Sequence, residues 1–139
     1  MTPGELEDRA AIKEVMVRYA HGLDQRDYAM LAACFTPDAY ADYGSFKDSG
    51  VEKIIDFLRS VLPRFEKTMH FLGNQLITFR EREAEVETYV VAYHVIPSES
   101  GRKLLVVGAR YLDRMVPVDG RWVVQHRVEA FDWRQTSAL

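Results

Sequence analysis

Cysteine is nearly absent from this chain, since Cys34 is the only one among 139 residues. A single cysteine excludes an intrachain disulfide and a cysteine-based metal cluster. Because Cys34 stands in the apolar stretch MLAACF, we predict a buried small apolar residue and not a nucleophile. The four histidines are scattered and lack the local spacing of a zinc motif such as HExxH. The sequence therefore predicts neither a bound metal nor a cofactor.

Long apolar runs and blocks of one charge are also missing. No apolar run approaches the roughly 18 residues of a membrane-spanning helix, and the stretch MTPGELEDRA lacks the positive start and apolar centre of a signal peptide. The 18 basic and 21 acidic residues are mixed along the chain, with a formal net charge of -3, and form no basic stripe for nucleic acid. We expect a cytoplasmic protein without nucleic-acid or membrane partners.

The apolar content suits one domain. Hydrophobic residues make up 47% of the chain and aromatic residues 12%, enough for a core that encloses a small cavity. No repeat, low-complexity tract or linker rich in Gly, Pro or Ser divides the sequence. We therefore assign residues 1–139 to a single domain.

The first part of the chain has helical periodicity. Apolar residues recur at three- and four-residue intervals over residues 6–23, which predicts a helix that Gly22 weakens near its end. A second short helix is predicted over residues 28–35, with Asp27 as its cap and the following Thr-Pro pair as its stop.

A short strand candidate, AYADY, and a third helix follow. Ser49 and Glu52 have the spacing of a capping box. An apolar stripe then runs from Val51 to Leu62, where Pro63 ends the helix.

After this proline the apolar period changes from helical to alternating. Four strand candidates follow, TMHFLGNQLITF, AEVETYVVAYHVI, KLLVVGARYLDRMV and RWVVQHRVEAFDW. The stretches REREA, PSESGR and PVDG connect them as hairpins. We predict an α+β fold in which three N-terminal helices wrap one face of a curved, mostly antiparallel sheet and leave a pocket between the layers.

Strand parity indicates which side chains face that pocket. In the second long strand candidate, Glu85 and Glu87 share one parity, so the other parity, which includes His94, faces inward. In the strand candidate that contains His70, both faces are apolar, and parity alone does not decide its direction.

The outward parity is unusually apolar. It contains Tyr89, Val91 and Tyr93, and we place Phe131 and Trp133 of the last strand candidate on the same outer surface. Isolated monomers seldom expose so large a patch. We therefore predict self-association as a homodimer or homotrimer.

The stretch HGLDQRD contains the main candidate for chemistry. Met16, Ala20 and Asp24 are successive i+4 positions, so a helix that continues this far directs Asp24 toward the interior. The alternative is a solvated polar residue at a helix end. His70 alone has two interpretations as well, a base or a satisfied core histidine.

Several stretches carry a resemblance to a known family, namely AAIKEVMVRYAHGLDQRDYAMLAACFTPDA, MHFLGNQ and DGRWVVQHRVEAFDW. Over nearly its whole length the chain resembles the SnoaL-like branch of the NTF2-like superfamily. It is similar there to scytalone dehydratase, the bile-acid 7α-dehydratases and hexachlorocyclohexane dehydrochlorinase. In these enzymes an aspartate at the end of the first helix pairs with a histidine on the first long strand, and Asp24 and His70 match the two positions.

The resemblance also assigns two tyrosines. Tyr19 matches the tyrosine of the bile-acid enzymes, and Tyr43 in ADYGSF matches a water-binding tyrosine of scytalone dehydratase. The chain departs from scytalone dehydratase at Leu23, where that enzyme has a tyrosine, and in the SES stretch after Pro97, where it has a histidine. The substrate is therefore left open.

An aspartate-histidine pair suits proton abstraction. The carboxylate fixes the imidazole tautomer and stabilises the imidazolium, so Asp24 would orient His70 as a general base. Tyr43 or Tyr19 would donate to the developing negative charge. We expect a cofactor-independent lyase of the dehydratase type, or an isomerase or cyclase, acting on a small hydrophobic cyclic or polyketide-like molecule.

We further predict substrate contacts at His94, Tyr111 and Arg127. For His94 the alternative is a structural hydrogen bond inside the sheet, and for Arg127 it is an exposed ion pair with Glu129 or Asp132. The alternative function is a noncatalytic ligand-binding or assembly module, such as a protein like the small subunit of ring-hydroxylating dioxygenases.

Overall fold

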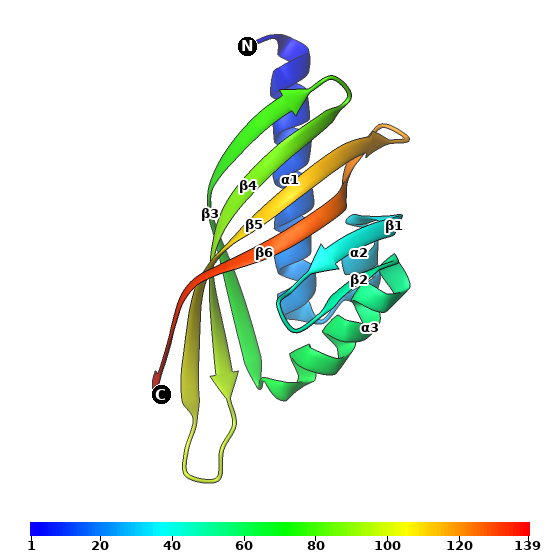
Figure 1. The fold of residues 1–139 in the computed structure, drawn as a ribbon. Helices are drawn as coiled ribbons and strands as arrows, with labels where there is room; N and C mark the ends of the chain where they lie inside the picture. Colours follow the sequence, from blue (N-terminus) through cyan, green and yellow to red (C-terminus); the bar gives the residue numbers. More distant parts are fainter.

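The structure, a computed structural model that describes residues 1–139, places helices on the concave side of one curved sheet (Figure 1). In chain order the elements are α1 (Pro3–Gln25), α2 (Tyr28–Ala32), β1 (Phe35–Asp42), β2 (Lys47–Ser49), α3 (Val51–Val61), a 3-10 turn (Leu62–Arg64), β3 (Lys67–Arg80), β4 (Glu83–Ile96), β5 (Lys103–Val118) and β6 (Arg121–Ala138). The predicted α+β cone is confirmed.

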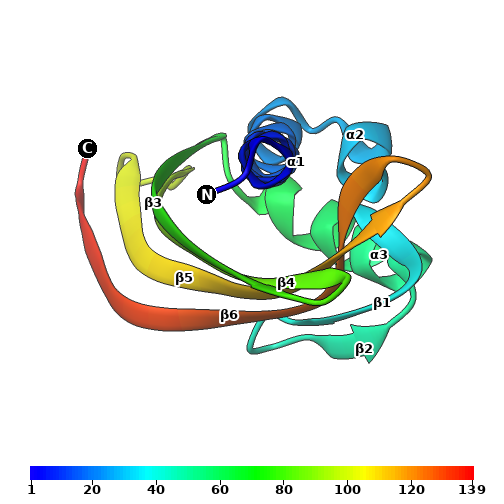
Figure 2. The same cartoon turned by 90° about the horizontal axis from the view of Figure 1, so that it is seen from above.

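The six strands form a single sheet in the order β2-β1-β6-β5-β4-β3. Only the pair of β1 and β6 is parallel, and all other neighbours are antiparallel. Figure 2 shows β4, β5 and β6 bending into an arc, with α1 lying on its concave side near β3. No helix is long and apolar enough to cross a membrane.

Helix α1 begins and ends at well-defined residues. The hydroxyl of Thr2 accepts a hydrogen bond from the backbone N of Glu5 at 3.1 Å, and Pro3 occupies the first helical position, where its missing N–H costs nothing. The helix ends at Arg26, whose φ of 56° is left-handed. The apolar stripe predicted for this helix is buried from Ile12 to Leu23, whereas Leu6 at its start is exposed.

Helix α2 ends sooner than predicted, and β1 begins earlier. The backbone N of Val124 donates to the carbonyl of Cys34 at 2.8 Å, and Phe35 pairs in parallel with the same Val124. Pairing with β6 therefore draws the chain out of the helix at Ala32. The Thr-Pro pair that we predicted as a helix stop lies inside β1.

One predicted cap is confirmed and the other is wrong. The carboxylate of Asp27 accepts from the backbone N of Met30 at 3.0 Å and caps α2. Ser49 instead belongs to β2, and the N-cap of α3 is Gly50, with a φ of 107° and no side-chain bond. The capping box fails because the strand extends to the residue before the cap.

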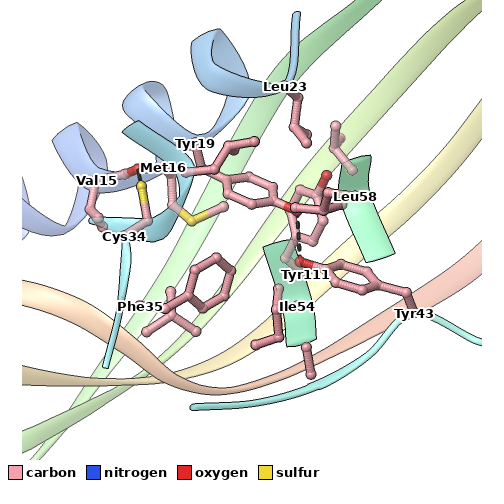
Figure 3. Close-up of a cluster of buried hydrophobic side chains, with 14 of the residues drawn as sticks. Val15, Met16, Tyr19, Leu23, Cys34, Phe35, Tyr43, Ile54, Leu58 and Tyr111 are labelled. Carbon is pink, nitrogen blue, oxygen red and sulfur yellow. Dashed lines mark hydrogen bonds between the residues drawn. The ribbon is translucent and has the colours of Figure 1, made fainter. Parts of the chain in front are cut away.

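The core lies between α1, α3 and the concave face of the sheet (Figure 3). Tyr19 and Leu23 of α1 meet Leu58 of α3 there. Cys34 is 2% exposed, and its Sγ donates to the carbonyl of Val15 at 3.6 Å. Burial raises the pKa of the Cys34 thiol to about 11. The prediction of a buried, apolar cysteine is confirmed.

A bulge in β6 overturns part of the predicted outer surface. Ala109 pairs with Phe131 and Gly108 pairs with Trp133, so Asp132 is the extra residue. Phe131 and Trp133 consequently lie on opposite faces of the sheet, and not together on the outer one as predicted. Trp133 covers Gly108, where a Cβ would come 2.2 Å from the indole.

Gly22 provides a test of packing beside the end of α1. Alanine favours a helix over glycine by about 1 kcal/mol. A Cβ at Gly22, however, would lie 2.9 Å from two carbons of Leu31, whose fully buried side chain would have to shift within the core. Overpacking of this kind costs about 1–3 kcal/mol. We expect Gly22→Ala to lower the free energy of unfolding by up to about 2 kcal/mol in urea titrations.

The matched control is Gly4→Ala in the first turn of the same helix. The Cβ there would meet only the Thr2 hydroxyl, at 4.0 Å. We expect no loss of stability for this control. Equal gains for both variants would contradict the packing account.

Candidate active site

The Asp24 carboxylate joins the end of α1 to the start of β3. Its Oδ1 accepts from Nδ1 of His70 at 2.7 Å and from the hydroxyl of Thr68 at 3.0 Å. Its Oδ2 accepts from the backbone N of His70 at 3.0 Å. Both carboxylate oxygens of Asp24 therefore have hydrogen-bond donors. The predicted contact between Asp24 and His70 is confirmed.

These hydrogen bonds favour the charged form of Asp24 and select one tautomer of a neutral His70 ring. Burial alone would raise the pKa of Asp24, but the hydrogen bonds from His70 and Thr68 outweigh it and lower the pKa. A carboxylate only accepts, so Nδ1 of His70 carries the proton and Nε2 of the neutral ring is left as an acceptor. The His70 side chain is 9% exposed and lines a cavity that Asp24 does not reach.

Arg26 adds further hydrogen bonds between the end of α1 and the start of β3. Its guanidinium donates to the carbonyl of Leu23 at 3.2 Å, to the hydroxyl of Thr68 at 3.3 Å and to the carbonyl of Phe65 at 3.2 Å. The Thr68 hydroxyl thus accepts from Arg26 while it donates to Asp24. The left-handed end of α1 and the first residues of β3 are locked together by side chains.

The cavity beside His70 has a volume of about 500 Å³ and a mainly hydrophobic lining. His94 shares its wall, with its ring 5.9 Å from that of His70 and nearly perpendicular to it. Nδ1 of His94 donates to the carbonyl of Leu105 at 3.2 Å. Burial lowers the pKa of His94, which favours a neutral ring. His94 thus faces inward as predicted, and it also makes the structural bond that was the alternative.

Three tyrosines form a second polar group in the cavity. Tyr19, Tyr43 and Tyr111 all line it, and the hydroxyls of Tyr19 and Tyr43 are 2.7 Å apart (Figure 3). Burial raises the pKa of all three phenols, which keeps them protonated. They are hydrogen-bond donors at neutral pH.

Arg127 lies beneath these tyrosines and not among the residues that line the cavity. Its guanidinium carbon is 4.3 Å from the ring centre of Tyr19 and 4.4 Å from that of Tyr111. It makes two hydrogen bonds to Asp113, at 2.7 and 2.8 Å, and both side chains are completely buried. The exposed pair with Glu129 or Asp132 that we considered is therefore wrong.

Sequence reasoning missed two residues that matter here. Thr68 has the same strand parity as His70, and that spacing was the available signal for its contact with Asp24. Glu129 lines the cavity, although it was considered only as an exposed partner of Arg127. Burial raises the pKa of Glu129 to about 7. No group of three or more His, Cys, Asp or Glu side chains is arranged to hold a metal ion.

Comparisons with known proteins place the chain in a family. It belongs to the SnoaL-like domain family, which matches residues 4–128. It is 31% identical over 132 residues to an uncharacterized protein of Mycobacterium tuberculosis, with 93% of this chain and 88% of the relative covered. The predicted membership of the SnoaL-like branch is confirmed.

Solved structures agree with this assignment. A Novosphingobium aromaticivorans protein provisionally named a scytalone dehydratase superposes with a TM-score of 0.88 at 28% identity, covering 100% of this chain and 93% of that one. A second protein of that organism, provisionally named an aromatic ring hydroxylase, gives 0.84 at 26% identity, with 100% and 96% covered. A hexachlorocyclohexane dehydrochlorinase of Novosphingobium barchaimii gives 0.85 at 22% identity, with 96% and 92% covered, which shows a shared fold alone.

Two arginine-aspartate pairs join β5 to β6 and differ mainly in burial. Removing one partner of a buried pair leaves an uncompensated charge and costs about 3–5 kcal/mol, whereas an exposed pair is worth about 1 kcal/mol or less. We expect Asp113→Asn to lower the unfolding free energy by about 3–5 kcal/mol in chemical denaturation.

The matched control is Asp132→Asn. Asp132 pairs with Arg110 through two hydrogen bonds of 3.0 Å, and the two side chains are 40% and 32% exposed. We expect a loss of no more than about 1 kcal/mol. Similar losses for both variants would show that the buried guanidinium does not depend on Asp113.

Proposed function

We propose that this protein is a cofactor-independent lyase of the dehydratase type, or a related isomerase or cyclase, in which Asp24 orients His70 as the general base. The observation that carries the proposal is the bond of 2.7 Å between Asp24 and Nδ1 of His70, made where the imidazole enters an apolar cavity. Nε2 of the neutral ring is then the atom that faces a ligand. An ionised carboxylate behind the ring stabilises the imidazolium that forms.

The reaction class follows from what surrounds this base. Removal of a proton next to a carbonyl or a leaving group creates negative charge on the substrate, which needs a donor. The paired hydroxyls of Tyr19 and Tyr43 supply one, because in a pair only one of the two protons is used between them. In a lyase the leaving group then departs from the neighbouring carbon. In an isomerase the proton instead returns to another carbon.

The substrate class is supported by the cavity. A volume of about 500 Å³ and a mainly hydrophobic wall suit a small cyclic molecule with few polar groups. The related structure provisionally named a scytalone dehydratase supports a dehydration. A noncatalytic binding or assembly role is the alternative. In such a role the three hydrogen bonds on Asp24 would serve only to hold α1 against β3.

Substitutions of the pair test the catalytic role. Asp24→Asn keeps the shape but removes the charge that favours the imidazolium, so turnover should fall about 10²- to 10⁴-fold while ligand affinity changes little. His70→Ala should cost about as much, and the double variant little more, because the two residues act as one unit. Tyr43→Phe should cost at most about 2.7–4 kcal/mol of transition-state stabilisation.

The substrate for these measurements comes from a screen of hydroxylated cyclic ketones and hydroaromatic compounds, read by absorbance of the conjugated product. His21→Ala is the matched control, since His21 is exposed on the same helix and bonds only to the carbonyl of Val17. Full activity in both Asp24→Asn and His70→Ala would refute the proposal.

We also propose that the convex face of the sheet binds a second copy of this chain. The outer-face patch consists of Met69, Phe71, Tyr89, Tyr93 and Trp133, which are 55%, 65%, 46%, 37% and 51% exposed. The strand register brings these side chains together across β3, β4, β5 and β6. Monomeric proteins seldom expose an apolar surface of this kind.

Light scattering tests the assembly directly. The chain has a mass of 16.0 kDa, and we expect twice or three times that mass at micromolar concentration. Phe71→Glu should shift the protein toward the monomer, whereas Leu6→Glu, at an exposed position of α1, should not. A wild-type protein that is monomeric under these conditions contradicts the prediction.

A further inference from the structure

Glu129 is a cavity-facing carboxyl group for which the protein supplies no partner. It lines the same cavity as His70, but it makes no hydrogen bond and lies within ion-pairing distance of no cation. The carboxylates beside it are paired, Asp113 with Arg127 and Asp132 with Arg110. Among the carboxylates of β5 and β6, Glu129 is thus the one without an arginine partner.

The charges that face Glu129 come from several elements and largely cancel. Arg127 on β6 and Asp113 on β5 neutralise each other as an ion pair. The other titratable neighbours are neutral phenols, Tyr111 on β5 and Tyr43 after β1. Burial raises the pKa of Glu129 to about 7, with Arg127 opposing the rise and Asp113 adding to it. A carboxyl group in this position keeps its proton more readily than it accepts an unpaired charge.

Glu129 and His70 stand at separate ends of the cavity. Their strands, β6 and β3, are three steps apart in the sheet, about 14 Å at the usual strand spacing before the sheet curves. Along the strands they are offset too. His70 lies in the row of Ala92 and Val107, whereas Glu129 pairs with Tyr111, four residues further along β5.

We propose that Glu129 carries a proton and donates a hydrogen bond to an acceptor oxygen of the ligand, at the end of the cavity away from His70. The cavity then selects small hydrophobic rings that carry a carbonyl or enolate oxygen at a distance from the carbon from which His70 removes a proton. This inference deepens the proposed function by naming the ligand class, and its catalytic meaning rests on that function. Its test needs binding alone, so the two ideas fail separately.

Stability against pH tests the protonation without any ligand. A carboxyl whose pKa is higher in the folded protein than in the unfolded chain stabilises the fold below the unfolded pKa of about 4.3. That contribution is lost as pH rises through about 7. Glu129→Gln cannot lose a proton. Its melting temperature should therefore rise relative to wild type between pH 5 and pH 8.

The control is Glu99→Gln, in the exposed connection between β4 and β5, where the difference from wild type should not change with pH. A melting-temperature difference for Glu129→Gln that is constant from pH 5 to pH 8 would overturn the inference.

Ligand preference tests the donor role. The probes are 1-tetralone, which has one carbonyl oxygen, and tetralin, which has the same ring system without it, each titrated by calorimetry. At pH 6 wild type should prefer 1-tetralone by roughly tenfold, the value of one hydrogen bond, and the preference should shrink at pH 8.5 as Glu129 loses its proton. Glu129→Gln, whose amide still donates, should keep the preference at both pH values.

Two further variants separate the inference from the catalytic proposal. Glu129→Ala should show at both pH values only the reduced preference that wild type has at pH 8.5, whereas His70→Ala should show the same preference and the same pH dependence as wild type. A preference that does not depend on pH in wild type, or that is undiminished at pH 6 in Glu129→Ala, would overturn the inference whatever the outcome of the catalytic assays.

Discussion

The structure of the site depends on one carboxylate. Asp24 accepts three hydrogen bonds from two residues of β3, and these bonds replace the water that its charge would otherwise need. They fix where α1 ends relative to the sheet and which nitrogen of His70 faces the cavity. Arg26 strengthens the same junction by donating to Thr68 and to the carbonyl of Phe65. The same three bonds therefore fix the packing of α1 on the sheet and the orientation of the His70 ring.

A completely buried ion pair organises the other end of the cavity. Arg127 lies between the rings of Tyr19 and Tyr111 and is neutralised by Asp113. It packs against both tyrosine rings without itself lining the cavity. The cavity therefore has the His70 imidazole at one end, phenol hydroxyls over a buried cation at the other, and an apolar wall between them. The proposed reaction relies on this distribution of polar groups.

Much of this could be predicted from local patterns. The position of Asp24 followed from the i+4 spacing that it shares with Met16 and Ala20, and the inward direction of His94 followed from the charged residues on the opposite parity of β4. Strand parity could not predict on which face of the sheet the His70 side chain lies, because β3 also has apolar side chains such as Phe71 exposed on its outer face. Only the resemblance to a family supplied it.

The remaining errors arose where distant parts of the chain meet. β1 starts early because β6 pairs with it, and the bulge at Asp132 reverses the face of Trp133 relative to Phe131. The burial of Arg127 and the position of Glu129 beside the cavity depend on the same strand register. A charged residue in a half-apolar strand is ordinarily placed outside, and nothing in the local sequence indicates the Asp113 partner on β5. These residues could be assigned only after the sheet was known.

The central claim is that Asp24 holds His70 with Nδ1 protonated and Nε2 free to act as a base. The most direct measurement is the tautomer of the neutral His70 ring, read from long-range proton-nitrogen correlations in NMR spectra of the nitrogen-15-labelled protein. The account predicts a protonated Nδ1 and an unprotonated Nε2 in wild type, with that preference lost in Asp24→Asn. A neutral ring protonated at Nε2, or a tautomer that Asp24→Asn leaves unchanged, would contradict it.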